Sequence, residues 1–463
     1  MLKNIDLTNQ KVLILGYAMT GKSVAEFLLE QGANITINDR GDLSKDPSVT
    51  LLLSQGAKIV SNGHPIELLD EGFDFIVKNP GIPYSLPIIQ KALERKLPIY
   101  TDVELASWFS EAPIIGVTGS NGKTTTTSLI YQLLSNRSKG QAYLAGNIGI
   151  PSLEVAKKAQ MDDDVIIELS SFQLMGIEKF KAKIAVICNI FEAHLDYHGS
   201  REEYIKAKLN LVKNLTSEDQ IVYNYDQQEF QTWLANTEAE RVPFAVDQVD
   251  EFVQKNGAYV IDSAIYFKGE KVAEVTDIQI PGKHNVENAL AAIAVAKLKN
   301  VSNESIKQSL HQFQGVAYRI QPIGQSQGRS FFNDSKATNI TATITALKSF
   351  NQSIVFVGGG LDRGNEFDEL IPYLKQVRAA YLYGETKHKM KNAFELAGVS
   401  QVELFDTLDE ATTVAYRAAE SDETVLLSPS CASWDQFKTF EERGKVFTDL
   451  IQRLMIEEPY QEK

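Results

Sequence analysis

The chain has 463 residues, of which 43% are hydrophobic, and it carries a formal net charge of −14 at pH 7. Its length predicts roughly two to four domains, and its acidic balance, without a Lys/Arg-rich tract, argues against a nucleic-acid partner. With two cysteines, no secretory signal pattern and no apolar run long enough to span a membrane, the sequence predicts a cytoplasmic protein without disulfides.

Residues 1 to 101 alternate short apolar runs with helical patterns, which predicts a parallel, doubly wound sheet. The runs are residues 11–15, 34–38, 57–60, 74–78 and 98–100. A turn containing Pro80 and Gly81 follows the fourth run. Ligands bind at the carboxyl ends of strands in such sheets, so this turn is either a ligand contact or a plain strand-ending turn.

The literal phosphate-loop pattern G-x-x-x-x-G-K-[ST] occurs at residues 16–23, between the first run and a helical segment at 22–30. The next strand ends in Asp39-Arg40, and an acidic residue about 20 positions after the glycines is the Rossmann arrangement for a ribose hydroxyl. Ala18 replaces the middle glycine of that arrangement. The loop therefore fits a mononucleotide or nucleotide-sugar better than a dinucleotide.

A second Gly-rich loop, Gly116-Val-Thr-Gly-Ser-Asn-Gly-Lys-Thr-Thr-Thr-Thr127, follows an apolar strand at 112–115 and precedes a helical segment at 124–134. Its three glycines are expected to let the backbone N–H groups point inward, where the helix N-terminus adds positive partial charge. Lys123 would reach the terminal phosphates, and the Thr124 hydroxyl would bind magnesium.

Val117 stands where the literal pattern has its first glycine, so this loop fails the pattern that residues 16–23 satisfy. The alternative is an ordinary Gly-rich turn with a surface lysine. We nevertheless predict that the second loop is the ATP site, because strand, glycines, lysine, threonine and helix occur in the required order and residues suited to magnesium follow.

Those residues are Glu168 and His194. Glu168 ends a predicted strand at 164–169, and His194 follows another at 183–190. Taken alone, Glu168 is more typical of a solvated or salt-bridged acid than of a metal ligand. Taken alone, His194 fits a structural histidine as well as it fits a metal ligand. Together, past the ends of neighbouring strands, they predict a shared metal site.

Two helical patterns complete the middle region, which we place at residues 102–315. Lys208 lies on a pattern that turns Leu209 and Val212 inward, and such a lysine is ordinarily at the surface. Asn285 and Asn288 share a face of an Ala-rich helix. Asn288 either contacts the nucleotide or helps cap the helix.

Residues 316–463 repeat the α/β alternation, with strands predicted at 353–357, 378–383 and 424–427. Arg319 lies in the linker that precedes them. Polar loops at 333–339, 358–365 and 428–437 follow strand ends, as a second substrate site would.

The ordered motifs resemble those of the Mur ligases, ATP-dependent amide ligases of peptidoglycan precursor synthesis, over essentially the whole chain. They are the second Gly-rich loop, Glu168-Leu-Ser-Ser-Phe-Gln-Leu, the His194 segment, His284-Asn-Val-Glu-Asn288 and Asn333-Asp-Ser-Lys-Ala-Thr-Asn339. The last of these and the run from Ser428 to Phe440 resemble most the members that add D-glutamate to UDP-N-acetylmuramoyl-L-alanine.

The resemblance implies three α/β domains: a Rossmann-like UDP-sugar domain (1–101), a central P-loop ATPase-type domain with a mainly parallel sheet (102–315) and a Rossmann-like amino-acid domain (316–463). It implies ATP and Mg²⁺ as cofactors, small-molecule substrates only, and neither nucleic acid nor membrane as partner. We expect a monomer.

The resemblance also assigns residues. Those at ATP are Gly119, Ser120, Asn121, Gly122, Lys123, Thr124, Thr125, Asn288, Arg319 and Asp334. Those at the UDP-sugar are Asp39, Arg40, Pro80, Gly81 and Asn147, and those at D-glutamate are Lys336, Thr338, Ser433 and Phe440. The metal ligands are Thr124, Glu168, His194 and Lys208, and the catalytic residues are Lys123, Glu168, His194 and Lys208. Lys208 completes the family's Tyr-x-x-Ala-Lys pattern, in which the lysine is carbamylated by CO₂.

Two positions depart from the family pattern. Ala193 stands where related enzymes can carry an acid, and the loop from Asp362 to Asn365 has no lysine for D-glutamate, so Arg363 is a candidate for that contact. The implied chemistry is phosphorylation of a carboxylate by ATP, followed by attack of an amine on the acyl phosphate. The alternatives are another Mur ligase, a folylpolyglutamate synthetase, or a nucleotide-regulated binding protein with no ligase step.

Overall fold

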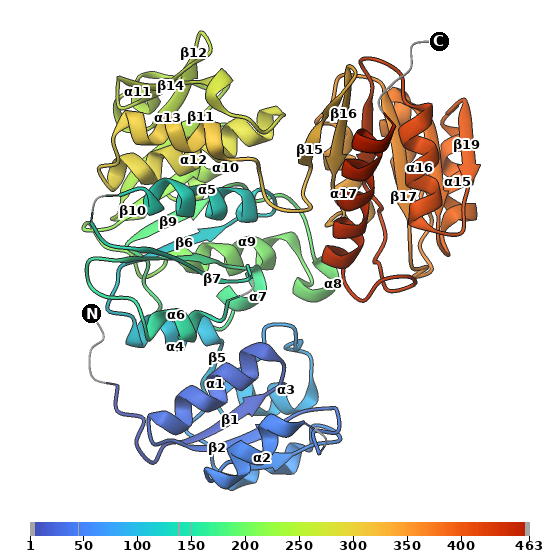
Figure 1. The fold of residues 1–463 in the computed structure, drawn as a ribbon. Coiled ribbons are helices and arrows are strands. Elements are labelled where there is room, and N and C mark those ends of the chain that lie inside the picture. The colour runs from blue at the N-terminus through green and yellow to red at the C-terminus, as the bar shows by residue number, and fades with distance from the viewer. Residues whose placement is uncertain (1–4, 45, 138, 149, 459–463) are drawn as a thin grey trace. The chain divides into compact units, whose positions relative to one another are not determined.

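The computed structural model describes residues 5–44, 46–137, 139–148 and 150–458. The chain forms two compact units, the first made of residues 1–277 and 287–309 and the second of residues 278–286 and 310–463. The first unit contains two β-sheets and the second contains one, each combined with helices (Figure 1). The predicted α/β fold is confirmed.

The N-terminal sheet is parallel throughout, in the order β3-β2-β1-β4-β5. Its strands are β1 (Lys11–Leu15), β2 (Asn34–Asn38), β3 (Lys58–Val60), β4 (Phe75–Lys78) and β5 (Ile99–Tyr100). Its helices are α1 (Met19–Glu30), α2 (Pro47–Ser54), the 3-10 helix η1 (Ile66–Glu71) and α3 (Pro87–Glu94). All five predicted strands are present, and α1 begins three residues earlier than the sequence pattern predicted.

The start of α1 requires glycine at position 21. A Cβ atom there would lie 2.0 Å from the carbonyl oxygen of Gly16, far inside van der Waals contact. Gly21 therefore lets the first turn of α1 pack directly on the loop that leaves β1, which is one of the uses of glycine in such folds.

The central sheet has nine strands in the order β14-β13-β12-β11-β10-β9-β6-β8-β7. They are β6 (Ile114–Thr118), β7 (Ala142–Gly146), β8 (Asp164–Glu168), β9 (Ile184–Ile187), β10 (Gln220–Asn224), β11 (Glu240–Ala245), β12 (Ala258–Ile261), β13 (Ala264–Phe267) and β14 (Glu270–Glu274). The pairs from β7 to β12 are parallel, and β12, β13 and β14 are antiparallel. The sheet is thus mainly parallel, as predicted.

The helices of this part of the first unit, together with α12 and α13, accompany the central sheet. They are α4 (Asp102–Phe109), α5 (Lys123–Ser135), α6 (Ser152–Ala156), α7 (Ser171–Leu174), α8 (Leu195–His198), α9 (Arg201–Leu209), α10 (Glu229–Trp233), α11 (Glu251–Asn256), α12 (Lys283–Leu298) and α13 (Asn303–Gln312), with 3-10 turns η2 (Asn210–Val212) and η3 (Val275–Asp277). Residues 289–296 of α12 are buried throughout, which explains the alanine-rich pattern of this helix.

Two predicted boundaries in this region are wrong. The strand before the second Gly-rich loop is not 112–115 but β6, which continues through Gly116 to Thr118. Gly116 therefore does not belong to the loop; a Cβ atom on it would lie 2.8 Å from Leu211 Cδ1, so this glycine makes room for core packing. The strand predicted at 183–190 is shorter, because β9 ends at Ile187.

The sheet of the second unit has the order β15-β16-β20-β17-β18-β19, with an antiparallel β15–β16 pair and otherwise parallel strands. Its strands are β15 (Gln321–Ser326), β16 (Arg329–Asn333), β17 (Ile354–Gly359), β18 (Val377–Tyr383), β19 (Gln401–Leu404) and β20 (Thr424–Leu427). Its helices are α14 (Ile340–Leu347), the 3-10 helix η4 (Asp368–Gln376), α15 (Lys387–Leu396), α16 (Leu408–Ala418) and α17 (Phe440–Glu457). The three strands predicted here are present with small shifts of boundary.

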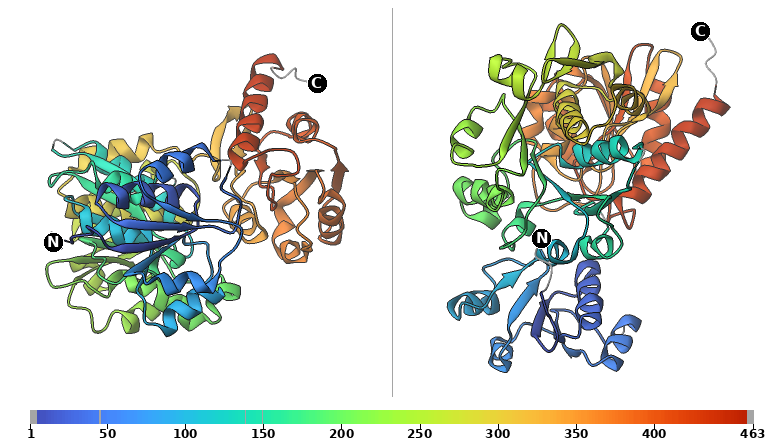
Figure 2. Two further views of the ribbon diagram at one scale, coloured as in Figure 1. Left: turned by 90° about the horizontal axis from the view of Figure 1, so that it is seen from below. Right: turned by 90° about the vertical axis from the view of Figure 1, so that its left-hand side faces the viewer.

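Alternate residues of β17 face two separate cores. Ile354 and Phe356 pack with residues of α14 and α15, whereas Val355 and Val357 pack with residues of α16 and α17. The sheet is therefore covered on both faces (Figure 2), as a mainly parallel sheet requires.

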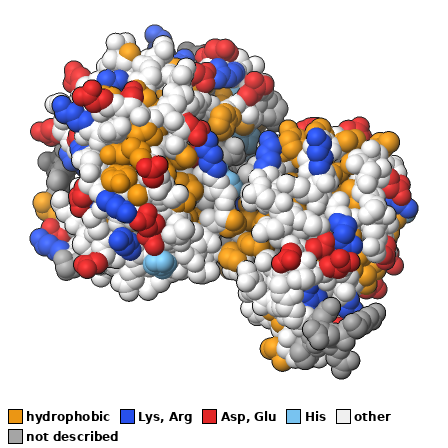
Figure 3. All heavy atoms as spheres, turned by 90° about the horizontal axis from the view of Figure 1, so that it is seen from above, with side chains coloured by type: hydrophobic (Ala, Val, Ile, Leu, Met, Phe, Trp, Pro, Cys, Tyr) orange, Lys and Arg blue, Asp and Glu red, His pale blue; other side chains and the backbone are white. Residues whose placement is uncertain are grey.

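On the face shown in Figure 3, acidic and basic side chains are interspersed. Within the described residues, no helix combines the length and the apolar character that crossing a membrane would need.

Candidate active site

The loop between β6 and α5 runs from Gly119 to Gly122 and lies against α12. Gly122 has φ +79° and directly precedes the first residue of α5. A Cβ atom on Gly122 would lie 2.2 Å from Asn288 Oδ1, and the Thr126 hydroxyl donates to the same oxygen at 3.2 Å. The structure thus brings Asn288 directly onto the loop.

The segment after β9 fixes the other side of this loop. The Ser120 N–H donates to the Asn189 carbonyl and the Asn121 N–H to Asn189 Oδ1, each at 2.9 Å. The Ser120 hydroxyl also lies 2.9 Å from the hydroxyl of Tyr204 on α9. The N–H groups of Ser120 and Asn121 are thus used inside the protein, and Thr124 and Thr125 at the start of α5 are buried. An anion at this loop would be met by the N–H groups at the start of α5.

Two lysines converge on one carbonyl of the loop. Lys123 Nζ donates to the Gly119 oxygen at 2.8 Å and Lys208 Nζ donates to the same oxygen at 2.7 Å. Lys208 is 1% exposed, although its position on a helix suggested a surface lysine. Burial, and then the nearby charge of Lys123, hold the pKa of Lys208 well below its ordinary value.

Glu168 lies at the carboxyl end of β8, is 1% exposed and faces the same region. Its Oε1 accepts a hydrogen bond from Asn147 Nδ2 at 2.9 Å. Its Oε2 is buried and has no hydrogen-bond partner among the described residues. An unpartnered buried carboxylate oxygen is costly in isolation and is a fitting ligand for a hard cation.

His194 is exposed and adopts φ +55°, and its ring packs edge-on against Phe172 with 5.1 Å between centroids. The described part of the chain contains no group of three or more His, Cys, Asp or Glu side chains arranged to hold a metal. A magnesium site at Glu168 would therefore also draw on other oxygen donors, and the Thr124 hydroxyl and a carbamate on Lys208 have the suitable chemistry.

A cavity of about 370 Å³ lies beside Glu168, between the N-terminal and central sheets of the first unit. It is lined by Met19, Thr20, Asn79, Pro80, Gly81, Asp102, Gly146, Asn147, Pro151, Ser170, Phe172 and Gln173. Three predicted UDP-sugar residues are thereby brought together: Pro80, Gly81 and Asn147.

The other two predicted UDP-sugar residues do not line this cavity. Asp39 uses both carboxylate oxygens locally, accepting from the N–H groups of Tyr17 and Gly41 at 2.7 Å each. It thus fixes the loop that follows β1 relative to the end of β2. Arg40 is exposed next to it.

Asp102, in the first turn of α4, also lines the cavity. It is buried, and its Oδ1 has no hydrogen-bond partner among the described residues. Burial raises the pKa of this carboxyl to about 6. Nothing in the local sequence distinguishes it from an ordinary acidic residue at a helix start, so the sequence reasoning missed it.

Lys78, at the end of β4, was also missed. Its Nζ donates to the Ile82 carbonyl at 2.8 Å and lies 4.8 Å from the centroid of the Tyr84 ring. The Tyr197 hydroxyl donates to the same Ile82 oxygen at 3.0 Å. Burial lowers the pKa of Lys78 to about 7. The lysine and the tyrosine together hold the turn that carries Pro80.

In the second unit, Asp334 follows β16 and is buried. It accepts hydrogen bonds from the Ser428 hydroxyl at 2.8 Å and from the Ile320 N–H at 3.2 Å. Burial raises the pKa of Asp334 to about 7, and the charge of Arg319 acts in the opposite direction. Arg319 Nε is itself buried without a hydrogen-bond partner among the described residues. These two predicted nucleotide residues are therefore electrostatic neighbours.

The predicted D-glutamate residues come from three segments of the second unit. Lys336 Nζ lies 5.6 Å from the centroid of the Phe440 ring, and the Thr338 N–H donates to the Lys336 carbonyl at 2.9 Å. Ser433 is 2% exposed. Arg363, the candidate in the loop without lysine, packs over the ring of Trp434 at 4.8 Å.

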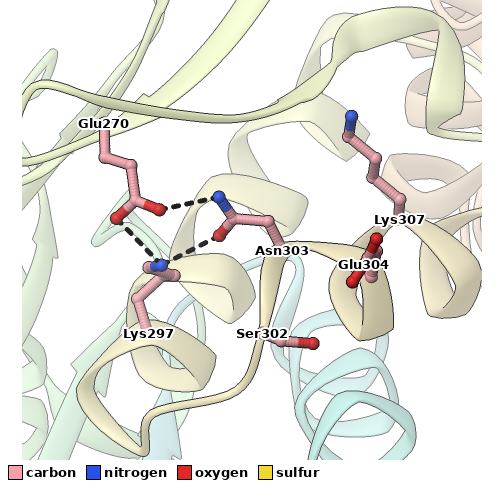
Figure 4. A pocket seen from close by; sticks show the side chains of 6 residues that line it. All are labelled: Glu270, Lys297, Ser302, Asn303, Glu304 and Lys307. Atoms are coloured by element: carbon pink, nitrogen blue, oxygen red, sulfur yellow. Dashed lines mark hydrogen bonds and ion pairs between the residues drawn. The ribbon is translucent and has the colours of Figure 1, made fainter.

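A second cavity, of about 420 Å³, lies on the surface of the first unit (Figure 4). Lys297 there pairs with Glu270 at 3.1 Å and with Asn303 Oδ1 at 2.8 Å. The charges of Lys297 and Glu270 thus neutralise each other. None of the residues that line this cavity is a predicted site residue.

Similarity to known proteins extends over nearly the whole chain. Family models describe residues 10–101 as the Mur ligase MurD-like N-terminal domain, 117–296 as the Mur ligase middle domain and 318–431 as the Mur ligase glutamate ligase domain. UDP-N-acetylmuramoylalanine–D-glutamate ligase of Enterococcus faecalis is 52% identical over 448 residues, covering 96% of this chain and 97% of that protein. The ligase of the same name from Listeria monocytogenes is 48% identical over 457 residues, covering 98% and 99%.

Solved structures agree in fold. UDP-N-acetylmuramate-alanine ligase from Thermotoga maritima has a TM-score of 0.58 at 18% identity, covering 96% of this chain and 100% of that one. MurF ligase from Thermotoga maritima, in complex with ADP, has a TM-score of 0.55 at 15% identity and covers 97% and 96%. The resemblance seen in the sequence is confirmed: the chain belongs to the Mur ligase family.

Proposed function

We propose that this chain is the ligase that adds D-glutamate to UDP-N-acetylmuramoyl-L-alanine at the expense of ATP, in peptidoglycan precursor synthesis. The observation that carries the proposal is 52% identity, over 96% of the chain, with a protein named for that reaction. The central loop with two lysines on one carbonyl supports the ATP-dependent step.

The reaction follows from the chemistry of the groups involved. A carboxylate is a poor acyl donor, so the γ-phosphoryl group of ATP is first moved to the carboxylate of the alanyl moiety to make an acyl phosphate. The amine of D-glutamate then attacks the carbonyl carbon, and inorganic phosphate leaves. Lys123 and Arg319 are suited to neutralise and position the phosphates. Closure around the site would keep the acyl phosphate from water.

We propose that Thr124, Glu168, His194 and a carbamylated Lys208 hold Mg²⁺. When bound, the ion supplies positive charge at the phosphates. The buried, unpartnered Glu168 Oε2 supports this arrangement.

The carbamate is supported by the environment of Lys208. Its low pKa makes the neutral amine available. The nitrogen lone pair forms a bond to the carbon of CO₂, and the nitrogen loses a proton. The product is an anion with two oxygen atoms that can bind a metal ion. An ammonium group at the same place has no oxygen and could not bind one.

The remaining assignments form part of the proposal. Gly119 to Thr125, Asn288, Arg319 and Asp334 contact ATP, and Asp39, Arg40, Pro80, Gly81 and Asn147 contact the UDP-sugar. Lys336, Thr338, Ser433 and Phe440 contact D-glutamate, with Arg363 as a further candidate. The domains are 1–101, 102–315 and 316–463, and the protein is a cytoplasmic monomer without nucleic-acid or membrane partners.

Phosphate release from ATP, measured with UDP-N-acetylmuramoyl-L-alanine and a panel of amino acids, tests the function. We expect release to depend on both the UDP-sugar and D-glutamate. Dependence on a different amino acid would point to another Mur ligase, and dependence on a folate to a folylpolyglutamate synthetase. Slow hydrolysis that ignores every acceptor would instead indicate a nucleotide-regulated binding protein.

A further inference from the structure

Arg443, in the first turns of α17, is a fully buried arginine at 0% exposure. No ion pair between described residues involves its guanidinium. The guanidinium makes three hydrogen bonds, to the Ser335 hydroxyl at 3.0 Å, the Ser335 carbonyl at 2.7 Å and the Cys431 carbonyl at 3.0 Å. Its charge also interacts at longer range with the carboxyl groups of Asp334 and Asp435. A buried cation is costly unless its donors are satisfied, so these contacts define its position strongly.

The three contacts join two loops that leave the paired strands β16 and β20, beyond the point where strand pairing and the Ser428–Asp334 hydrogen bond hold them together. Ser335 belongs to the loop after β16, and Cys431 belongs to the loop after β20. The Ser335 hydroxyl accepts from Arg443 Nε and donates to the Phe440 carbonyl at 2.7 Å. One guanidinium therefore ties together the two loops and the start of α17.

Each tether lies next to a proposed contact of the acceptor amino acid. Lys336 directly follows Ser335, Ser433 is two residues beyond Cys431, and Phe440 receives the Ser335 hydrogen bond. The neighbouring Gly444 lets this turn of α17 pack directly on Tyr318, since a Cβ atom there would lie 2.2 Å from the Tyr318 ring.

We propose that Arg443 is a positioning residue for the amino-acid acceptor: its planar fork sets the spacing of Lys336, Ser433 and Phe440 without touching the substrate. This rests on the proposed function. The planar guanidinium is required because its nitrogens donate in fixed directions to carbonyls on two loops and to a hydroxyl. A lysine has one nitrogen at the end of a flexible side chain and cannot make these three hydrogen bonds together. The role is geometric, so it predicts an effect on acceptor binding rather than on the nucleotide.

The test is steady-state phosphate release by the whole protein, with D-glutamate and ATP varied separately. Arg443→Lys keeps the charge and removes the fork, and we expect it to raise KM for D-glutamate by about tenfold or more, as loss of a charge-assisted hydrogen bond does. KM for ATP should stay within about twofold. Arg453→Lys makes the same chemical change at an exposed position of α17 and should leave both constants unchanged.

Ser335→Ala is the second variant, since it removes one hydroxyl and leaves the arginine in place. We expect a several-fold rise in KM for D-glutamate and no change in KM for ATP. In the double variant with Arg443→Lys, the rise in KM for D-glutamate should be smaller than the product of the two single rises, because both changes break the same contact. Thermal unfolding will show whether Arg443→Lys is folded. If it is not, the KM values of Ser335→Ala test the inference on their own.

Wild-type KM for D-glutamate in Ser335→Ala, or in a folded Arg443→Lys, would overturn the inference. Equal rises in KM for D-glutamate and ATP would also overturn it, because they would indicate general loosening of the domain. Failure of the wild type to respond to D-glutamate is a different result: it would overturn the proposed function, and this inference with it.

Discussion

Replacing Gly122 by alanine should separate the two phosphate-loop candidates. An L-residue at φ +79° costs about 1–2 kcal/mol. The added Cβ would also lie 2.2 Å from Asn288 Oδ1, so Asn288 must move and give up its contact with Thr126. Losing that buried hydrogen bond costs about 1–3 kcal/mol. The total of about 2–5 kcal/mol is a cost to the folded loop. Because it displaces Asn288, a proposed ATP contact, we expect a loss of ATP affinity of about tenfold or more if the loop binds ATP.

Isothermal calorimetry with a non-hydrolysable ATP analogue, and separately with the UDP-sugar, measures this directly. Gly72→Ala is the matched control for backbone strain, because Gly72 has φ +71° and a Cβ there would meet nothing within 4 Å. It should leave both affinities unchanged. Gly21→Ala places a Cβ 2.0 Å from the Gly16 carbonyl and should weaken the UDP-sugar alone.

The outcome that refutes this reasoning is Gly122→Ala binding the ATP analogue as the wild type does. If Gly21→Ala lost ATP affinity instead, the loop that matches the literal sequence pattern would be the ATP site after all.

Four further predictions can be checked by kinetics and unfolding. Lys123→Ala should abolish turnover. Lys22 is exposed and lies 4.0 Å from Glu26, so Lys22→Ala should keep kcat and at most raise KM for the UDP-sugar. The opposite pattern would reverse the assignment of the two loops. Lys336→Ala should raise KM for D-glutamate far more than KM for ATP, and equal effects would place Lys336 elsewhere. Lys208→Ala and Lys208→Arg should both be inactive, with partial rescue of the alanine variant by small carboxylates; a fully active arginine variant would contradict the carbamate. The raised pKa of Asp102, about 6 against 3.8 when unfolded, means that ionisation destabilises the fold increasingly as pH rises from 4 to 7, by up to about 3 kcal/mol. Asp102→Asn should therefore gain thermal stability relative to the wild type between pH 5 and pH 8, and a pH-independent difference would show that Asp102 is not buried as an acid.

The strands were the most predictable part of the fold. β1, β2 and β20 match the sequence prediction residue for residue, because each is an apolar run bounded by turn-forming or polar residues. The end of β6 was mistaken because glycine and threonine there suggest a loop, whereas Gly116 pairs with Ile167 of β8 and Ala185 of β9 and is therefore strand. The antiparallel β12–β14 edge was not predicted, although β12 (Ala-Tyr-Val-Ile) and β13 (Ala-Ile-Tyr-Phe) are short apolar runs.

The predicted site residues drew on two sources. Physical reasoning from the sequence favoured the loop, Glu168 and His194, whereas Lys208 came from the family pattern alone, since helix lysines are ordinarily solvated. Lys78, Asp102 and Arg443 were missed by both. The two cations bind backbone carbonyls, and carbonyls are present at every position of a sequence, so no side-chain pattern identifies their partners in advance.

The carbonyl of Ile82 has a consequence for how this chain tolerates mutation. Lys78 and Tyr197, 119 residues apart, both donate to that one oxygen. An acceptor with two donors keeps one when the other is lost, so the turn behind the 370 Å³ cavity is built with redundancy. A substitution at either donor leaves the oxygen satisfied, and the second then becomes the sole support. Loss of one donor is therefore expected to make loss of the other more costly, so the effects of substitutions at Lys78 and Tyr197 should not be independent.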